Sequence, residues 1–219
     1  MESMDKKILI ITGGRITDHF LLEQLEKEKY SMIIAADHGL AAADRLMLSP
    51  DFIVGDFDSV PEAILSKYRG KSAPIETFPR EKDKTDTQIA VELALMHNPS
   101  RIDIIGATGS RLDHVIANIH LLVLPLQAGC TACIIDEKNK IYLMEHSFFI
   151  SRTMQHGDYV SLLPFTDKVS GLTLKGFKYP LDHVTLTSGS SLGISNEIVE
   201  EEAEVELLEG ILLVIEARD

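Results

Sequence analysis

The first 136 residues alternate short, almost continuously apolar runs with longer segments in which apolar residues recur every three or four positions. Such runs are typical of parallel strands buried on both faces, and the longer segments are typical of amphipathic helices. This alternation predicts an α/β N-terminal domain with a parallel, doubly wound sheet. We expect its strands at 7–12, 32–36, 51–54, 73–78, 102–105 and 130–135, with helices between them.

The pattern changes after about residue 136, where no segment has convincing helical spacing. Short strand-like segments separated by turn residues follow, which is typical of antiparallel sheets. We expect these strands at 140–144, 147–151, 159–164, 169–175 and 205–215. The chain is therefore predicted to comprise an α/β domain, 1–136, and a smaller all-β sandwich domain, 137–219.

Two predicted helices have recognisable features at their starts or along one side. Thr85-Asp86-Thr87-Gln88 fits a capping box, in which the first residue caps a helix and the fourth reaches back to it. We expect the helix that follows to bury Ile89, Leu93 and Met96. A further helix from about Leu112 is expected to run to about Val123 with its apolar residues on one side.

Composition and charge narrow the class of protein. The formal net charge is −13 over 219 residues, which argues against nucleic acid or an anionic membrane as the main partner. No apolar run reaches the length of a membrane span, and the N-terminus lacks a signal-peptide pattern, so we expect a cytoplasmic protein. Cys130 and Cys133 stand at i and i+3 of a predicted strand without further metal ligands, which predicts buried free thiols.

Pairs of carboxylates supply the first candidate chemistry. Asp56 and Asp58 follow the predicted strand at 51–54, and in an extended segment their side chains lie on one face. Two carboxylates about 4 Å apart repel by roughly 4 kcal/mol at an effective dielectric near 20, so a proton or a cation must sit between them. Asp83 and Asp86 form a second acidic pair, and oxygen ligands of this kind suit Mg²⁺ rather than Zn²⁺. A solvated turn with capping aspartates is the alternative interpretation.

The candidate motifs all follow predicted parallel strands, and ligands of open parallel sheets bind beyond the carboxyl ends of the strands. Gly106-Ala107-Thr108-Gly109 leads into a helix N-terminus, which can hold a phosphate through backbone N–H groups. Arg111 could add a bidentate contact to that phosphate. For Asp113 and His114, a role as first-turn helix residues is as plausible as a functional one. The motifs at this edge are 37–39, 56–58, 83–86 and 106–111.

Together these residues carry a resemblance to a known family. Gly55-Asp56-Phe57-Asp58-Ser59, Asp83-Lys84-Thr85-Asp86 and the stretch 106–114 resemble the thiamine pyrophosphokinase family in order and spacing, and Ser195-Asn196-Glu197 resembles it late in the chain. The chain departs from the family pattern at His38 and Ser110, where the family often has glycine, and it has no tryptophan.

The resemblance implies transfer of pyrophosphate from ATP to thiamine, giving thiamine diphosphate and AMP, in a Mg²⁺-dependent homodimer. The first domain would bind the nucleotide and catalyse, and the second would bind thiamine and dimerise. Asp56, Asp58 and Asp86 would be the catalytic, metal-holding residues. The residues expected to bind the nucleotide are Asp37, Thr85, Gly106, Thr108, Gly109, Arg111, Asp113 and His114. Those expected to bind thiamine are Asp83, Gln88, Ser195 and Asn196.

Other functions fit parts of the same pattern. A related pyrophosphokinase could act on another alcohol, such as a hydroxymethylpterin. Asp56-Phe57-Asp58-Ser59-Val60 also fits the D-x-D-x-[T/V] pattern of Mg²⁺-dependent haloacid-dehalogenase-type phosphatases, in which Asp56 would be the nucleophile. A nucleotide-binding regulator without catalysis is a third possibility, because a fold by itself does not specify an activity.

Overall fold

The computed structural model describes residues 6–55, 60–68 and 83–219, together with the backbone of 75–77. The chain divides into two compact units, residues 1–136 and 137–219, and each is described by itself.

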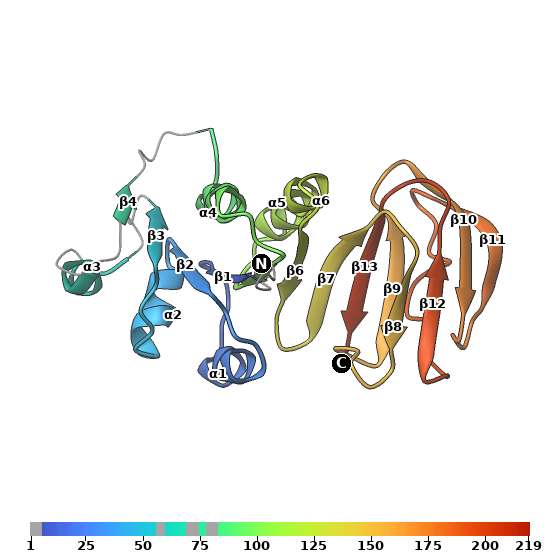
Figure 1. Ribbon diagram of the computed structural model, residues 1–219, viewed down its shortest axis with the longest axis horizontal. Helices are drawn as coiled ribbons and strands as arrows, with labels where there is room; N and C mark the ends of the chain where they lie inside the picture. Colours follow the sequence, from blue (N-terminus) through green and yellow to red (C-terminus); the bar gives the residue numbers. More distant parts are fainter. Residues whose placement is uncertain (1–5, 56–59, 69–74, 78–82) are drawn as a thin grey trace, which may run out of the picture. The chain divides into compact units, whose positions relative to one another are not determined.

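The first unit is built on a parallel sheet with the strand order β4-β3-β2-β1-β5-β6 (Figure 1). The central strand β1 pairs with β2 on one side and with β5 on the other, so Ile10 lies opposite both Ile34 and Ile104. All three of these side chains are buried, as their apolar runs predicted. The strands are β1 Lys7–Ile11, β2 Met32–Ala36, β3 Phe52–Gly55, β4 Ile75–Thr77, β5 Arg101–Ile105 and β6 Thr131–Ile135.

Helices cover both faces of this sheet, which makes it doubly wound, as expected. Helices α4, α5 and α6 lie on one face, and α1 and α2 lie on the other (Figure 1). Helix α4 packs against β1, β2 and β3. The helices are α1 Asp18–Lys27, α2 Gly39–Arg45, α3 Glu62–Tyr68, α4 Asp86–Met96, α5 Leu112–Leu121 and α6 Val123–Gln127.

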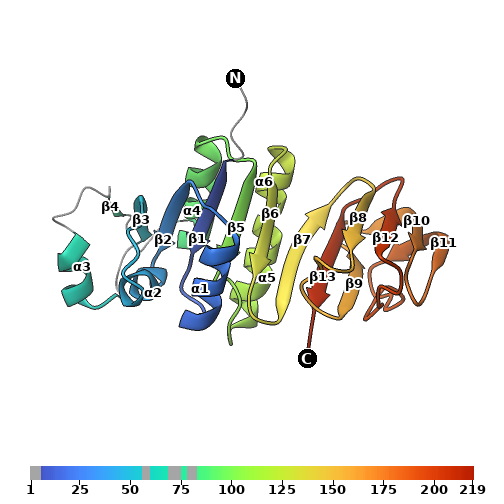
Figure 2. The ribbon, with the colours of Figure 1, turned by 60° about the horizontal axis from the view of Figure 1, so that its bottom comes forward.

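The second unit is an antiparallel sandwich (Figure 2). One layer has the order β7-β13-β9 and the other has the order β11-β10-β12-β8. Alternate residues of both layers point inward and share one core, which includes Val160, Leu174, Val205 and Val214. The strands are β7 Asn139–Met144, β8 Phe148–Ser151, β9 Tyr159–Pro164, β10 Lys168–Lys175, β11 Leu181–Thr187, β12 Glu202–Glu206 and β13 Leu212–Ala217.

The structure corrects several expectations about individual elements. Met96 is 78% exposed at the end of α4, because the helix stops there and only Ile89 and Leu93 of the expected set are buried. The helix expected from Leu112 to Val123 is two helices, because the ring of Pro125 is incompatible with a helix that continues through Leu121.

Two further corrections concern the sandwich. The segment expected as one strand, 205–215, is two, β12 and β13, separated by a turn at Gly210 with φ of 103°. Strand β11 is absent from the expected set, because its pairing with β10 is irregular and His183, with φ of 50°, interrupts the alternation of side chains.

Cys130 and Cys133 of the first unit are buried free thiols, as predicted. Among the described residues no helix is long and apolar enough to cross a membrane.

Candidate active site

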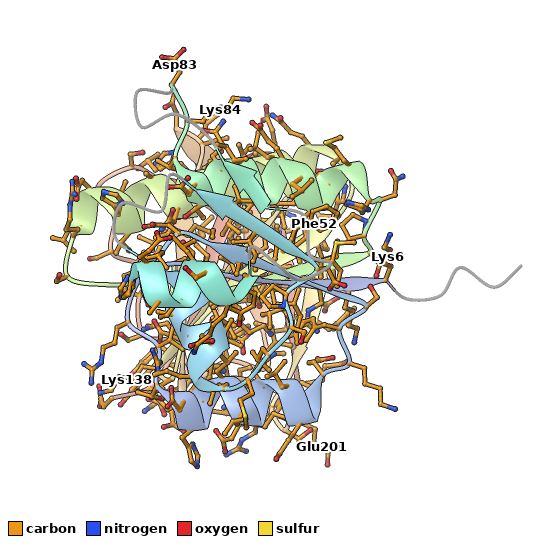
Figure 3. The ribbon with its side chains drawn as sticks, turned by 90° about the vertical axis from the view of Figure 1, so that its left-hand side faces the viewer. Lys6, Phe52, Asp83, Lys84, Lys138 and Glu201 are labelled. Atoms are coloured by element: carbon orange, nitrogen blue, oxygen red, sulfur yellow. The ribbon has the colours of Figure 1, made fainter. Side chains whose placement is uncertain are left out.

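A pocket of about 480 Å³ opens in the first unit where β1, β2 and β5 end and where α4 and α5 begin. Figure 3 labels Lys84 just before α4, near the top of the view, and Lys6 and Phe52 toward its right, at the starts of β1 and β3. The pocket lies at the other ends of the strands, the carboxyl ends of β1, β2 and β5. This is the edge at which open parallel sheets bind ligands. The pocket is lined by residues 12–14, 37, 84–87, 106–111, 114, 115 and 118.

Backbone from two glycine-containing loops lines part of this pocket. Gly14 donates its N–H to the carbonyl oxygen of Gly106 at 2.7 Å, and Arg15 donates to that of Thr108 at 3.3 Å. A Cβ atom on Gly14 would lie only 2.3 Å from each of those two oxygens, so only glycine allows the loops to meet. The buried Asn118 of α5 donates from Nδ2 to the carbonyl oxygen of Ala107 at 2.8 Å, which ties the second loop to the helix behind it.

The start of α4 is held by side chains on both sides of Asp86. Thr85 caps the helix by accepting the Gln88 N–H at 3.2 Å. The hydroxyl groups of Thr87 and Thr12, both buried, are 2.9 Å apart and fix the first turn of α4 to the end of β1. Asp86 therefore enters the pocket as the first residue of a fixed helix.

Only half of the predicted capping box forms. The Gln88 side chain donates to Glu92 at 3.0 Å, further along the helix, instead of returning to Thr85. Gln88 is not among the residues that line the pocket.

Charged groups of both signs surround the pocket. Asp37 stands directly after β2 with φ of 48°, a left-handed conformation uncommon outside glycine, and its N–H donates to Val54 at 2.8 Å. Arg111, at the mouth, makes a fork of hydrogen bonds to the two carboxylate oxygens of Asp113 at 3.2 and 2.5 Å. Those hydrogen bonds raise the pKa of Arg111 and lower the pKa of Asp113, so both groups stay charged. Lys84 lines the pocket as well and pairs with Glu92 at 2.8 Å.

Most of the residues predicted for the nucleotide line this one pocket, together with Asp86: Asp37, Thr85, Gly106, Thr108, Gly109, Arg111 and His114. Asp113 holds Arg111 but is not a lining residue, and Asp83 is exposed on the segment before α4. Asp56 and Asp58 lie outside the described residues; they follow β3, which ends at Gly55 and pairs with β2.

The pocket residues that the sequence did not predict are Thr12, Gly13, Gly14, Thr87, Val115 and Asn118. The glycine pair could have been found, because it directly follows the first strand of a parallel sheet, where close backbone approach is common. Nothing local in the sequence marks Thr12 or Asn118, because their roles depend on partners at Thr87 and Ala107.

Ser195 and Asn196 belong to the second unit, in the long loop between β11 and β12. Ser195 is exposed with φ of 53°, and its N–H donates to the Ser161 hydroxyl at 3.0 Å. Asn196 is only 4% exposed, and its amide group bonds to backbone atoms of Tyr179 and Glu197. The structure therefore gives Asn196 a role in holding this loop, and direct contact with a substrate stays a prediction.

Comparison with known proteins matches both units. The thiamin pyrophosphokinase catalytic domain matches residues 23–134, and the thiamin pyrophosphokinase vitamin B1 binding domain matches residues 145–212. The thiamine pyrophosphokinase of Bacillus subtilis is 32% identical over 98% of this chain and 100% of the relative. The chain belongs to the thiamine pyrophosphokinase family.

Solved structures of other thiamine pyrophosphokinases agree with this assignment. The Bacillus subtilis structure superposes with a TM-score of 0.88 at 32% identity, covering 98% of this chain and 100% of the other. The thiamin pyrophosphokinase structure from Geobacillus thermodenitrificans superposes with a TM-score of 0.83 at 31% identity, covering 97% of this chain and 98% of the other.

The comparisons confirm the family, the fold class and the enzyme class that the sequence resemblance implied. They support neither a phosphatase nor a pyrophosphokinase for another alcohol. The pocket lies in the unit that matches the catalytic domain of the family, and Ser195 and Asn196 lie in the segment that matches its vitamin B1 binding domain.

Proposed function

We propose that this protein transfers the terminal pyrophosphoryl group of ATP to the hydroxyl group of thiamine, giving thiamine diphosphate and AMP. The thiamine oxygen attacks the β-phosphorus, the bond between that phosphorus and the oxygen of the leaving AMP breaks, and the hydroxyl proton is lost. The pocket at the ends of β1, β2 and β5, into which α4 and α5 point their first turns, is the observation that carries this proposal. Transfer of this kind needs mainly positioning of the phosphates and neutralisation of their charge.

The described residues divide this work between backbone and side chains. The first turns of α4 and α5 and the N–H groups of the Gly106–Gly109 loop provide donors and positive dipole ends for phosphate oxygens. Arg111 and Lys84 bring cationic groups to the mouth of the pocket, each paired with a carboxylate, Asp113 and Glu92 respectively. Asp113 orients the Arg111 guanidinium. An oriented guanidinium can bind a phosphate in one defined geometry, which a mobile side chain does not provide.

We further propose Mg²⁺ as the metal that accompanies ATP. The donors on this edge of the sheet suit it: Asp86 offers a carboxylate in the pocket, and Asp56 and Asp58 follow β3 in the sequence. Among the described residues there is no cluster of three or more histidine, cysteine, aspartate or glutamate side chains that could hold a metal. Asp56, Asp58 and the phosphate oxygens would supply the remaining ligands, as the sequence resemblance implies. The bound ion would supply positive charge to those oxygens, and Asp86 would fix its position.

The two units take different parts in this proposal. Residues 1–136 would bind the nucleotide and catalyse, and 137–219 would bind thiamine and dimerise. The acidic chain, with a net charge of −13, fits small-molecule substrates in the cytoplasm better than nucleic acid.

We propose that the working enzyme is a homodimer. Leu112 and Ile116, one turn apart on α5, are exposed in the single chain, although α5 also carries pocket residues such as His114. An exposed apolar stripe beside a polar pocket is the kind of surface that a second subunit covers.

The nucleotide product decides the reaction class. Incubation with ATP, thiamine and Mg²⁺, followed by chromatography, should give one AMP per thiamine diphosphate. A parallel reaction without thiamine should leave ATP intact, and one with EDTA should give no product. Stoichiometric ADP would contradict pyrophosphoryl transfer, and release of phosphate from a monoester without ATP would indicate a phosphatase.

A further inference from the structure

Donors outside the Gly106–Gly109 loop hold three successive carbonyl groups of that loop, from Gly106 to Thr108. In chain order, the donors are the Gly14 N–H at 2.7 Å, the Asn118 side chain at 2.8 Å and the Arg15 N–H at 3.3 Å. The last of these bonds is longer than the usual range for N–H···O hydrogen bonds. The backbone bonds therefore hold the Thr108 end of the loop less tightly than the Gly106 end.

A side-chain hydrogen bond also holds the Thr108 end. The Thr108 hydroxyl group donates to Asp136 Oδ2 at 2.7 Å. Hydrogen bonds to a carboxylate are shorter and roughly twice as strong as those between neutral groups. This bond therefore compensates for the long backbone bond from Arg15 to the Thr108 carbonyl oxygen.

The pairing of β5 with β6 brings Asp136 to this loop. Ile105, the last residue of β5, pairs with Ile135, the last residue of β6, so Gly106 and Asp136 leave the sheet side by side at its carboxyl edge. Asp136 is half-buried, and it is not among the residues that line the pocket. Its carboxylate therefore reaches the pocket through Thr108, which does line it.

Holding the carbonyl groups also orients the N–H groups of the loop. The carbonyl of one residue and the N–H of the next point in opposite directions across a trans peptide bond, and the described chain has no cis peptide bond. The three held carbonyl groups thus fix the N–H groups of Ala107, Thr108 and Gly109. Within the described part of the chain, none of these three N–H groups donates to a protein atom. All three residues line the pocket, so their donors are available to a ligand there.

We infer that Asp136 is a positioning residue for the nucleotide, whose carboxylate fixes Thr108 and with it the N–H groups that meet the phosphates. The inference rests on the proposed function, in which this loop holds the phosphates of ATP. It also defines the part that Thr108 plays. The hydroxyl hydrogen of Thr108 is committed to Asp136, so Thr108 serves the nucleotide through its backbone N–H.

The negative charge of Asp136 separates positioning from metal binding. A carboxylate near phosphate groups repels them, so only its acceptor oxygen helps a residue that acts through Thr108. Asp136→Asn keeps an acceptor and removes the charge, and it should bind ATP as tightly as wild type or more tightly. A metal ligand would behave in the opposite way: a fall of about 100-fold in kcat for Asp136→Asn, as expected for Asp86→Asn, would overturn the inference.

Calorimetric titration of the full chain with ATP and Mg²⁺, without thiamine, measures nucleotide affinity in the absence of turnover. Thr108→Val keeps the shape of the side chain and removes the hydroxyl, so the Kd for ATP should rise about tenfold. Thr108→Ser keeps the hydroxyl and should stay within about twofold of wild type. Asp136→Ala should match Thr108→Val. Glu137→Gln is the control, because it removes the same charge from an exposed neighbour, and its Kd should not change.

The double variant tests whether the two residues act as one unit. Thr108→Val and Asp136→Ala remove the same hydrogen bond, so together they should weaken ATP binding by about tenfold, as each does alone. A loss of about 100-fold in the double variant would show independent effects and would overturn the inference. So would a wild-type Kd in Thr108→Val at an unchanged urea midpoint.

Steady-state kinetics separate positioning from a general loss of structure. Thr108→Val should raise the KM for ATP and leave the KM for thiamine unchanged, whereas an equal rise in both would overturn the inference. Failure of the proposed function gives a different result. If wild type makes no thiamine diphosphate but its ATP affinity responds to these variants as expected, the reaction fails and the inference holds. If wild-type turnover is normal and Thr108→Val binds ATP like wild type, only the inference fails.

Discussion

Replacing Gly14 by alanine tests whether the contact between the two glycine-containing loops builds the pocket. The new Cβ would lie 2.3 Å from the carbonyl oxygens of Gly106 and Thr108, and Cβ atoms essentially never approach another heavy atom within 3.0 Å. Each oxygen must therefore retreat by roughly 0.7 Å, the difference between these two distances. Both neighbours are backbone, so no side-chain rotation can relieve the clash.

The same movement weakens the hydrogen bond between the loops. The Gly14 N–H bonds the Gly106 oxygen at 2.7 Å, so a retreat of this size stretches the bond to the limit of hydrogen-bonding distance. Overpacking costs about 1–3 kcal/mol and the hydrogen bond about 1 kcal/mol, so the free energy of unfolding should fall by about 2–4 kcal/mol. Because the displaced loop is the one expected to hold phosphate, kcat/KM for ATP should fall about 100-fold.

Urea unfolding and steady-state kinetics measure the two effects. Gly109→Ala is the control for stability, because its Cβ would meet only Gly14 Cα, at 3.9 Å, and its φ is not in the left-handed region. That variant should unfold at the same urea concentration as wild type or slightly above it, since alanine restricts the unfolded chain. A Gly14→Ala protein with wild-type stability and an unchanged KM for ATP would refute the argument that this contact shapes the pocket.

Other variants address the metal, the loop, the sheet and the dimer. Asp86→Asn should lower kcat by about 100-fold or more without loss of stability, measured at saturating Mg²⁺; near-normal kcat would remove Asp86 from the metal site. Asn118→Ala should raise the KM for ATP several-fold while the KM for thiamine stays constant, because it frees the Ala107 carbonyl. Asp103→Ala should lower the free energy of unfolding, measured in urea, by about 2–4 kcal/mol, because buried Asp103 accepts hydrogen bonds from Arg101, Tyr30 and Cys133. A smaller loss would show that water replaces the Asp103 carboxylate. Asp86→Asn and Asn196→Ala chains can be mixed so that heterodimers form. If each site takes its first unit from one chain and its second unit from the other, one site of the heterodimer carries neither defect, and up to about half of wild-type activity should return. If each site takes both units from one chain, every site carries one of the defects and no activity should return.

Much of the architecture was determined by the sequence alone. The apolar runs ending at Ile11, Ala36 and Ile105 predicted strands buried on both faces, and Thr85 was predicted to cap the helix that follows it, as it does. Local chemistry also placed the polar motifs directly after strands, which predicted one shared edge. The described motif residues Asp37, Asp86 and Gly106 do meet there.

Tertiary structure decided which of these residues work together. The order of strands puts β1 between β2 and β5, and only that order brings Gly14 against Gly106 and Thr12 against Thr87, partners far apart in the sequence. The hydrogen bonds of Asn196 to the backbone of Tyr179, 17 positions away, likewise appear only in the folded chain. Caps and apolar runs are fixed by a few adjacent residues, so the sequence displays them. A hydrogen bond or a close backbone approach between distant segments depends on how the whole sheet is assembled, and no local pattern encodes it.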